Sequence, residues 1–123
     1  NNNKFYTQMK NQDYLNIVKD AMWRVVNEKR VGTASHMKKV GNIEFAGKTG
    51  TAQVYNLDKG KTGTKNLQDH ALFISYAPFE KPEIVVTVIV EHGGGGSTTA
   101  APIARDIIEY YMNNKKQKVA VNE

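Results

Sequence analysis

The chain has 123 residues, enough for one domain with a small core, and its lack of cysteine excludes a disulfide framework and a thiolate metal site. Its formal net charge of +5 comes from lysines scattered through loops and the tail, so we expect a solvated surface and no nucleic-acid partner. No apolar run is long enough to cross a bilayer and no secretory signal is recognisable, so we expect any membrane anchor to lie outside the chain.

The first predicted element is a helix over residues 12–30. Its apolar side chains recur at steps of three and four on one face, namely Leu15, Val18, Met22 and Val25 or Val26. Asn11 is the predicted cap and Gly32 the predicted stop. We assign Trp23 to the core rather than to a ligand pocket, because it belongs to this apolar pattern. Residues 1–10 lack periodicity and are expected to be frayed.

Residues 45–55 predict an extended strand that carries polar groups between apolar neighbours. Alternation places Lys48, Gly50 and Ala52 on one face and Thr49, Thr51 and Gln53 on the other. Gly50 in a strand interior indicates close approach of a ligand or of another backbone. Such a strand suits an anionic, peptide-like ligand, to which Lys48 offers positive charge and Thr49 and Thr51 offer hydroxyl groups.

Two further strands are predicted at residues 71–77 and 84–91, and their short proline-containing connection favours an antiparallel hairpin. Because the strand at 84–91 is apolar on both faces, we expect helices on both sides of the sheet there. The glycine run that follows, Gly93–Gly96, indicates either a close approach of the backbone to a ligand or strand, or a plain flexible turn.

The last predicted helix begins near residues 97–99, because Pro102 is tolerated only in a first turn. Its predicted buried stripe consists of Ile103, Ile107 and Tyr111, with Ala104 and Ile108. We expect residues 113–123 to be a disordered tail. The predicted elements together give an α+β fold of helix, three-stranded antiparallel sheet and helix.

The order of these motifs resembles one protein family. Lys48-Thr49-Gly50 is the third motif shared by penicillin-binding proteins and serine β-lactamases, and residues 46–54 resemble its form in class B penicillin-binding transpeptidases. Asp69-His70-Ala71-Leu72-Phe73, the run 88–97 and Ala101-Pro102-Ile103-Ala104-Arg105 are similar to the segments that follow it there. The resemblance extends from about residue 14 to 112 and is greatest to the penicillin-binding protein 2 group of the cell-elongation machinery.

The resemblance implies that residues 1–123 are the carboxy-terminal part of a β-lactamase/transpeptidase-like domain. In that family the last of the three strands pairs with a strand from the beginning of the domain. We therefore expect the edge of the strand at 84–91 to pair with another chain, or to be covered by a rearranged segment.

The activity implied by the resemblance is cross-linking of peptidoglycan by D,D-transpeptidation through a serine acyl-enzyme, a serine that β-lactams also acylate. Lys48 and Thr51 would then be catalytic: Lys48 by stabilising the substrate carboxylate, Thr51 by offering its N–H to the oxyanion. Thr49, Gly50 and Thr51 would bind the substrate. Neither nucleophile nor general base is recognised in the chain, so the fragment alone is expected to be inactive.

Other patterns resemble known sites but lack the required surroundings. Ser35-His36-Met37-Lys38 has the Ser-x-x-Lys spacing of the family's nucleophile motif, yet no apolar helix follows it, and we take the match as accidental. Lys61-Thr62-Gly63-Thr64 repeats the key motif within a polar stretch, residues 56–68, that predicts an exposed loop. Gly47-Lys48-Thr49 is not a phosphate-binding loop, because the glycine spacing is wrong and strand follows it.

The three histidines, His36, His70 and His92, share no helix face and have no metal-ligand spacing, so we expect neither a metal nor a cofactor. We assign Glu91 and His92 to capping or surface chemistry.

The resemblance also implies the partners: stem peptides ending in D-Ala-D-Ala, β-lactam antibiotics, a SEDS-family glycosyltransferase and elongation-complex proteins. The intact protein would sit in the bacterial cytoplasmic membrane with its catalytic domain on the periplasmic side. Two alternatives stay open. One is a fragment of a serine β-lactamase or D,D-carboxypeptidase, which would not be expected to carry the glycine run and residues 101–105. The other is a non-catalytic domain that binds a peptide along the strand edge.

Overall fold

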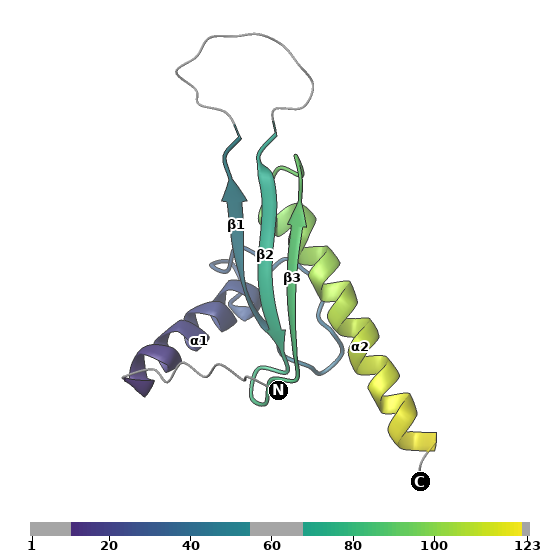
Figure 1. Cartoon of the computed structure of the whole chain (residues 1–123). Helices are drawn as coiled ribbons and strands as arrows, with labels where there is room; N and C mark the ends of the chain where they lie inside the picture. Colours follow the sequence, from purple (N-terminus) through teal and green to yellow (C-terminus); the bar gives the residue numbers. More distant parts are fainter. Residues whose placement is uncertain (1–10, 55–67, 122–123) are drawn as a thin grey trace, which may run out of the picture.

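The structure, a computed structural model, describes residues 11–54 and 68–121, with side chains to residue 115. Its centre is an antiparallel sheet of three strands in the order β1 (Ala46–Ala52), β2 (His70–Ala77) and β3 (Ile84–Val90). Helix α1 (Gln12–Asn27) lies on the β1 side of the sheet and helix α2 (Ala101–Val121), preceded by the short π-helix η1 (Gly96–Ala100), on the β3 side (Figure 1). The predicted order of helix, three strands and helix is confirmed.

Helix α1 begins where predicted but ends three residues early. The Asn11 side chain accepts the Asp13 N–H at 2.8 Å and so caps the helix. After Asn27 the chain folds back, with Arg30 at a φ of 71°, and the Gly32 N–H donates to the Glu28 carbonyl at 2.9 Å. The predicted end at residue 30 was wrong because Gly32 packs against the last turn instead of stopping it.

The packing of α1 involves mainly its carboxyl half. Val25 and Val26 contact the core, and half-buried Trp23 donates its Nε1–H to the Glu44 carboxylate at 3.0 Å. No residue of α1 is fully buried, and Val18, predicted to face the core, is 52% exposed. The core prediction was wrong for Val18, because none of the described elements lies over that end of the helix.

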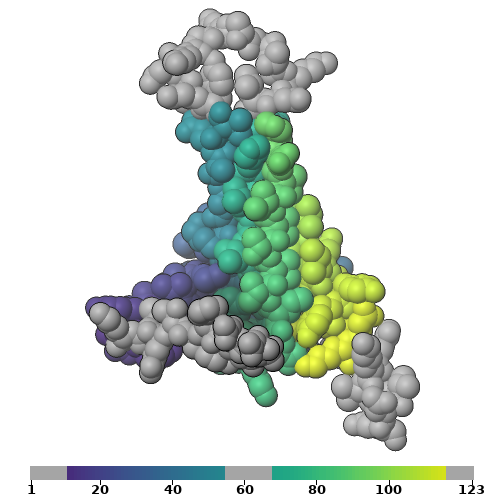
Figure 2. Space-filling view, viewed as in Figure 1, coloured from purple at the N-terminus to yellow at the C-terminus, as the bar shows by residue number. Residues whose placement is uncertain are grey.

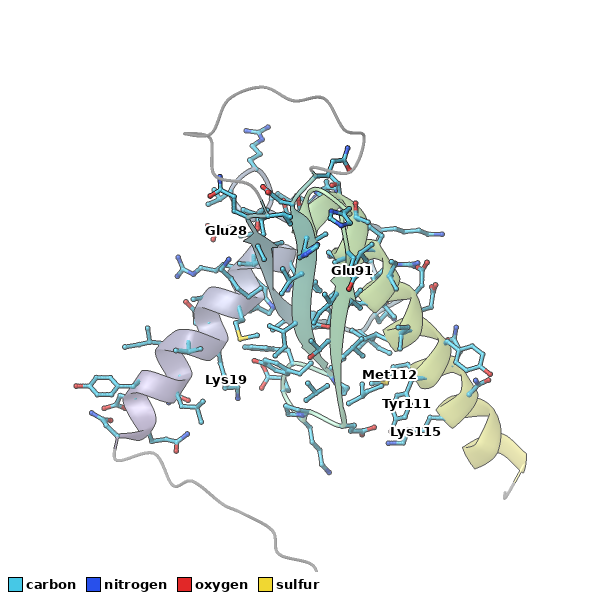
Figure 3. All side chains as sticks on the ribbon, turned by 45° about the horizontal axis from the view of Figure 1, so that its top comes forward. Lys19, Glu28, Glu91, Tyr111, Met112 and Lys115 are labelled. Atoms are coloured by element: carbon cyan, nitrogen blue, oxygen red, sulfur yellow. The ribbon has the colours of Figure 1, made fainter. Side chains whose placement is uncertain are left out.

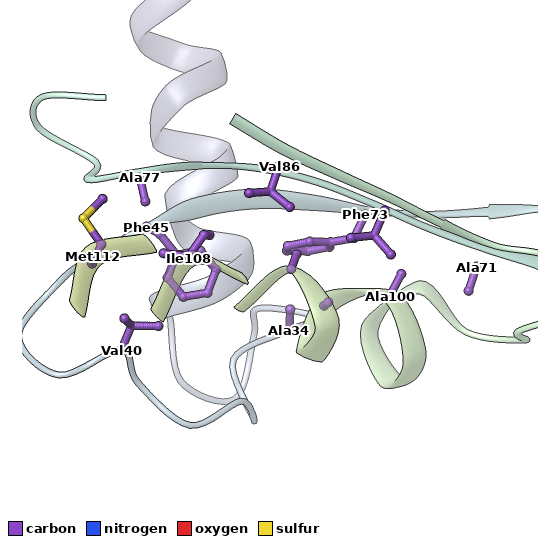
Figure 4. Packing of buried hydrophobic residues seen from close by; sticks show 13 residues of the cluster. Ala34, Val40, Phe45, Ala71, Phe73, Ala77, Val86, Ala100, Ile108 and Met112 are labelled. Atoms are coloured by element: carbon purple, nitrogen blue, oxygen red, sulfur yellow. The ribbon is translucent and has the colours of Figure 1, made fainter. Parts of the chain in front are cut away.

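The core lies between one face of the sheet and α2 (Figure 4). Phe73 from β2 and Val86 from β3 project toward Ile108 of α2 and Ala100 of η1. Its buried members are Ala34, Val40, Phe45, Ala71, Phe73, Ala77, Val86, Val88, Ala100, Ala101, Ala104, Ile108 and Met112. The alanines at the start of α2 let the helix backbone come close to the strands, so that the Phe73 ring fills the remaining space.

The buried face of α2 differs from the predicted one. Ala104, Ile108 and Met112 are buried, whereas Ile103, Ile107 and Tyr111, which were predicted to form the main stripe, are exposed. The helix carries two adjacent apolar stripes, and size rather than hydrophobicity selects between them. The stripe with the small residue at its amino end allows the closer approach to the sheet.

Helix α2 continues through Val121, so the prediction of a disordered tail was wrong for residues 113–121. Figure 3 shows Lys115 on α2. Its ammonium group forms an ion pair with Glu83, the residue before β3, and this pair links the helix to the sheet. The hydrogen bond with Glu83 also raises the pKa of Lys115 above its usual value. The pair is long-range in sequence, so the local polar composition gave no sign of it.

Strand β3 is covered on one face only. Val86 and Val88 are buried beneath α2, whereas Val85 and Ile89 on the opposite face are 67% and 64% exposed, and this face stays open between the two helices (Figure 2). The prediction of helices on both faces was therefore wrong for the described chain. No strand in residues 11–54 or 68–121 pairs with the outer edge of β3, so a rearranged covering segment is not found there. Pairing with a second chain stays a prediction.

We expect Gly47→Ala to destabilise the protein, because a Cβ at this position would lie 2.4 Å from Cζ of Phe73 and 2.9 Å from the Ile74 carbonyl oxygen. The Phe73 ring is only 1% exposed and has no room to move away. The expected loss is about 2–3 kcal/mol of unfolding free energy, measured by urea denaturation.

Gly50→Ala is the matched control on the same strand, since its Cβ would meet only the Leu72 Cβ, at 3.3 Å. Its expected cost is about 1 kcal/mol or less. Equal losses for the two variants would contradict the Phe73 explanation.

Candidate functional site

Strand β1 lies at one edge of the sheet. It pairs with β2 in the register Ala46–Tyr76 to Ala52–His70, and no described strand pairs with its other side. The backbone groups of an edge strand point alternately toward the partner strand and toward the open edge. The Phe45 carbonyl accepts a bond from Asn27 Nδ2 at 2.9 Å and the Thr49 carbonyl one from Lys48 Nζ at 2.6 Å.

These two side-chain bonds show that odd-numbered residues point their backbone groups to the open edge. By the same alternation we infer that the N–H and carbonyl of Thr51 also face it. A ligand lying along β1 therefore meets backbone donors and acceptors as well as side chains.

The motif side chains are accessible along this edge. Lys48 and Thr51 are exposed, and Thr49 and Gly50 are half-buried. The Thr49 hydroxyl lies 3.3 Å from the hydroxyl of Thr33, in the turn after α1, a contact that the sequence did not indicate. The predicted strand is confirmed over Ala46–Ala52, whereas the binding and catalytic roles of Lys48 and Thr51 stay predictions.

The glycine run lies directly behind the motif. A Cβ on Gly96 would lie 2.5 Å from the Gly50 carbonyl oxygen and 2.4 Å from that of Leu72, so the amino end of η1 touches the backbone of the β1–β2 pair. Of the two interpretations of the run, the structure supports the close approach to another strand.

Hydrogen bonds from the start of β2 hold the segment before η1. The His92 N–H donates to His70 Nδ1 at 2.9 Å, and the Gly94 N–H donates to the Asp69 carbonyl at 2.8 Å. The Thr99 hydroxyl donates to the Gly93 carbonyl at 2.7 Å. Sequence reasoning considered His70 only as a metal ligand, and no local pattern links residues 22 positions apart.

The structure also places the patterns that were set aside. Ser35 lies in a turn, not at the start of a helix, as expected, and it lines a cavity of about 470 Å³ between the end of α1 and the chain leading to β1. Residues 47–49 lie on β1, and no helix follows directly, so they do not form a phosphate-binding loop. The second motif copy, residues 61–64, falls outside the described residues. Among the described residues, no three His, Asp or Glu side chains gather as a metal site.

Residues 6–109 match the family described as the penicillin binding protein transpeptidase domain. The chain belongs to this family. The match covers α1, all three strands and α2 as far as residue 109, and so includes the open-edged β1.

Among similar proteins, the peptidoglycan D,D-transpeptidase MrdA of Haemophilus influenzae is 45% identical over 106 residues, which are 82% of this chain and 16% of that protein. A crystal structure of Pseudomonas aeruginosa PBP2 in complex with WCK 5153 has a TM-score of 0.69 at 33% identity and covers 85% of this chain and 21% of its own. Helicobacter pylori PBP2 in complex with MreC has a TM-score of 0.65 at 31% identity and covers 96% and 20%.

The chain thus spans about one sixth to one fifth of the length of these penicillin-binding proteins. In the part of the chain that the structure describes, neither helix has the length and apolarity needed to cross a membrane.

We expect Gly96→Ala to force η1 away from the motif, because the atoms that its Cβ would meet belong to the backbone of Gly50 and Leu72 and cannot rotate aside. The expected loss of unfolding free energy is about 2–3 kcal/mol, again measured by urea denaturation.

Gly95→Ala is the control for this substitution. Its Cβ would come within 3 Å only of the Thr98 hydroxyl, at 2.8 Å, and that side chain can turn away. A Gly96→Ala protein as stable as the Gly95→Ala protein would show that the backbone contact is unimportant.

Proposed function

We propose that the chain is the carboxy-terminal part of the catalytic domain of a penicillin-binding protein 2 type peptidoglycan D,D-transpeptidase, with β1 as one wall of the active site. The observation that carries the proposal is the open edge of β1, where Lys48 and Thr51 are exposed, in a chain 45% identical to a D,D-transpeptidase. The serine nucleophile and the general base come from outside these 123 residues, so the chain alone does not acylate.

The open edge suits an extended peptide that ends in a carboxylate. Without a ligand, Lys48 Nζ donates to a neutral acceptor, the carbonyl of Thr49, at 2.6 Å. A stem peptide ending in D-Ala-D-Ala offers a carboxylate instead, which adds the Coulomb attraction between opposite charges to the hydrogen bond. The hydroxyls of Thr49 and Thr51 supply further donors, while Gly50 leaves the surface of the strand free of side-chain atoms.

The backbone N–H of Thr51 stabilises the second negative charge at the site, the oxyanion that forms during the reaction. When the serine attacks the D-Ala carbonyl, its oxygen becomes an oxyanion, and the Thr51 N–H at the open edge donates to it. One such donor contributes about 3 kcal/mol to lowering the barrier. The second donor is the N–H of the nucleophile itself. β-Lactams bind in the same way, with their carboxylate at Lys48 and their carbonyl at the Thr51 N–H.

The proposed partners follow from the same relatives. Because Helicobacter pylori PBP2, which is similar over 96% of this chain, was solved in complex with MreC, we assign the intact protein to an elongation complex. A SEDS-family glycosyltransferase is the partner that would supply glycan strands for cross-linking. The site of action is then the periplasmic side of the cytoplasmic membrane.

Lys48→Ala in the intact protein is expected to lower the second-order rate of acylation by a fluorescent penicillin about 100-fold, because the charge that meets the carboxylate is lost. The rate is measured by stopping the labelling reaction at successive times and quantifying the fluorescent protein on a gel. Lys81→Ala, which removes an exposed lysine from the β2–β3 connection, serves as the control and should label at the unsubstituted rate. Similar rates for both variants would refute the role given to Lys48.

Ser35→Ala in the intact protein is expected to leave acylation unchanged, because Ser35 lies in a turn that lines the cavity beside α1 and opens no helix. The same labelling experiment tests this, and mass spectrometry of the labelled peptide locates the adduct. An adduct on Ser35, or loss of labelling in the variant, would show that the Ser35–Lys38 match is a true nucleophile motif.

A further inference from the structure

Two histidines meet at the end of the sheet next to the motif strand. His70 begins β2 directly opposite Ala52 of β1, and His92 follows β3. Their rings lie edge to face, with centroids 4.9 Å apart. The backbone N–H of His92 donates to His70 Nδ1 at 2.9 Å, while His92 Nδ1 lies 3.1 Å from the carbonyl oxygen of Gln68.

These bonds assign opposite protonation to the two Nδ1 atoms. A backbone N–H only donates, so His70 Nδ1 carries no proton, and a carbonyl only accepts, so His92 Nδ1 does carry one. Adding a proton to His92 leaves its bond to Gln68 intact. A proton added to His70 Nδ1 would instead face the N–H of His92, and the bond would be lost.

The bond from His92 stabilises a backbone conformation that needs support. His92 has a φ of 53°, in the left-handed region that residues other than glycine seldom adopt. Two residues later the Gly94 N–H donates to the Asp69 carbonyl, and two residues after that Gly96 packs on the backbone of Gly50. His92 is therefore the first residue of the segment 92–96 that a hydrogen bond to the sheet holds in place, and this segment ends behind the lysine-threonine-glycine motif.

We propose that His70 is a positioning residue of the active site: as a neutral acceptor for the His92 N–H, it holds residues 92–96 against the motif strand. Loss of the acceptor frees the segment, and β1 loses the backbone support behind Gly50. The link to acylation rests on the proposed function, whereas the link to the 92–96 segment does not.

Few titratable groups lie next to His70. In the described structure they are Asp69, its neighbour in the chain, His92, and Glu91, which precedes His92. The Asp69 carboxylate already accepts the Val54 N–H at 3.3 Å, and β1 contributes no ionisable group opposite His70, where Ala52 lies. A proton on His70 Nδ1 would break the His70–His92 bond, because the backbone N–H of His92 cannot accept.

Two substitutions distinguish the role of His70 as a hydrogen-bond acceptor from that of its imidazole ring. His70→Leu removes the acceptor, whereas His70→Asn places an amide oxygen near the position of Nδ1 and does not titrate. His36→Leu and His36→Asn, at an exposed position in the turn after α1, are the matched controls.

The first measurement is acylation of the intact protein by a fluorescent penicillin at pH 8. We expect His70→Leu to lower the second-order rate about tenfold and His70→Asn to recover it to within about threefold of the unsubstituted rate. Both His36 variants should label at the unsubstituted rate. If His70→Leu does not fold, His70→Asn decides, and a His70→Asn rate tenfold or more below the unsubstituted rate overturns the proposal.

The second measurement is independent of activity. Amide hydrogen exchange at His92 and Gly94, corrected for intrinsic rates, should be about tenfold faster in His70→Leu and near the unsubstituted rate in His70→Asn. Unsubstituted protein that fails to acylate would reject the proposed function, and the exchange rates would still test the positioning role. Exchange at His92 and Gly94 that is equal in the unsubstituted protein and in His70→Leu would overturn that role.

Discussion

The structure depends on one constraint: β1 must be held firmly from one side so that its other side can stay open. Glycines within a strand weaken it, and β1 has two, Gly47 and Gly50. The Phe73 ring lies against Gly47, where a Cβ would not fit, and the glycine at position 96 lets the backbone of η1 pack against Gly50. The strand is therefore stabilised by β2 and by contacts behind it. Among the described residues, the side-chain bonds that a ligand would meet at the motif are those from Lys48 to the Thr49 carbonyl and between the hydroxyls of Thr33 and Thr49.

The bond from Lys48 explains why the motif strand is tolerated at a sheet edge. An exposed edge strand invites pairing with other chains, and proteins blunt such edges with charged side chains, lysine above all. Lys48 has this effect in the unliganded protein, because its ammonium group occupies the carbonyl of Thr49 that a second strand would need. In the proposed function a carboxylate ligand would displace this bond, so the same side chain would serve both protection of the edge and recognition.

Much of the fold could be predicted from the sequence, because its local signals agree with one another. The alternation in residues 45–55 predicted the strand β1, and the helix cap at Asn11 was found from the residue type alone. What failed depended on partners distant in the chain. The Lys115–Glu83 pair that accompanies the extension of α2 joins residues 32 positions apart.

The choice of the buried face of α2 failed for a related reason. Hydrophobic periodicity ranks Ile103 and Ile107 above Ala104, but packing density favours the residue that brings two backbones together. In the candidate site, the motif residues were predicted because their chemistry is local. The contacts of His70 with His92 and of Thr33 with Thr49 were not predicted, since each joins residues that are distant in the sequence and meet only in the folded chain.

The two edges of the sheet differ in chemistry, and this difference assigns them different partners. The β1 edge offers an ammonium group, hydroxyls and free amides, all of which suit a small anionic peptide. The β3 side exposes Val85 and Ile89, and α2 beside it exposes Ile107 and Tyr110, with no lysine or arginine between Ile84 and Val90. An apolar face of this kind gains more from another polypeptide than from a charged ligand. The chemistry of the two sides thus favours β3, opposite the motif, as the side on which a further protein segment packs, and it agrees with the proposal that the edge of β1 stays open to a ligand.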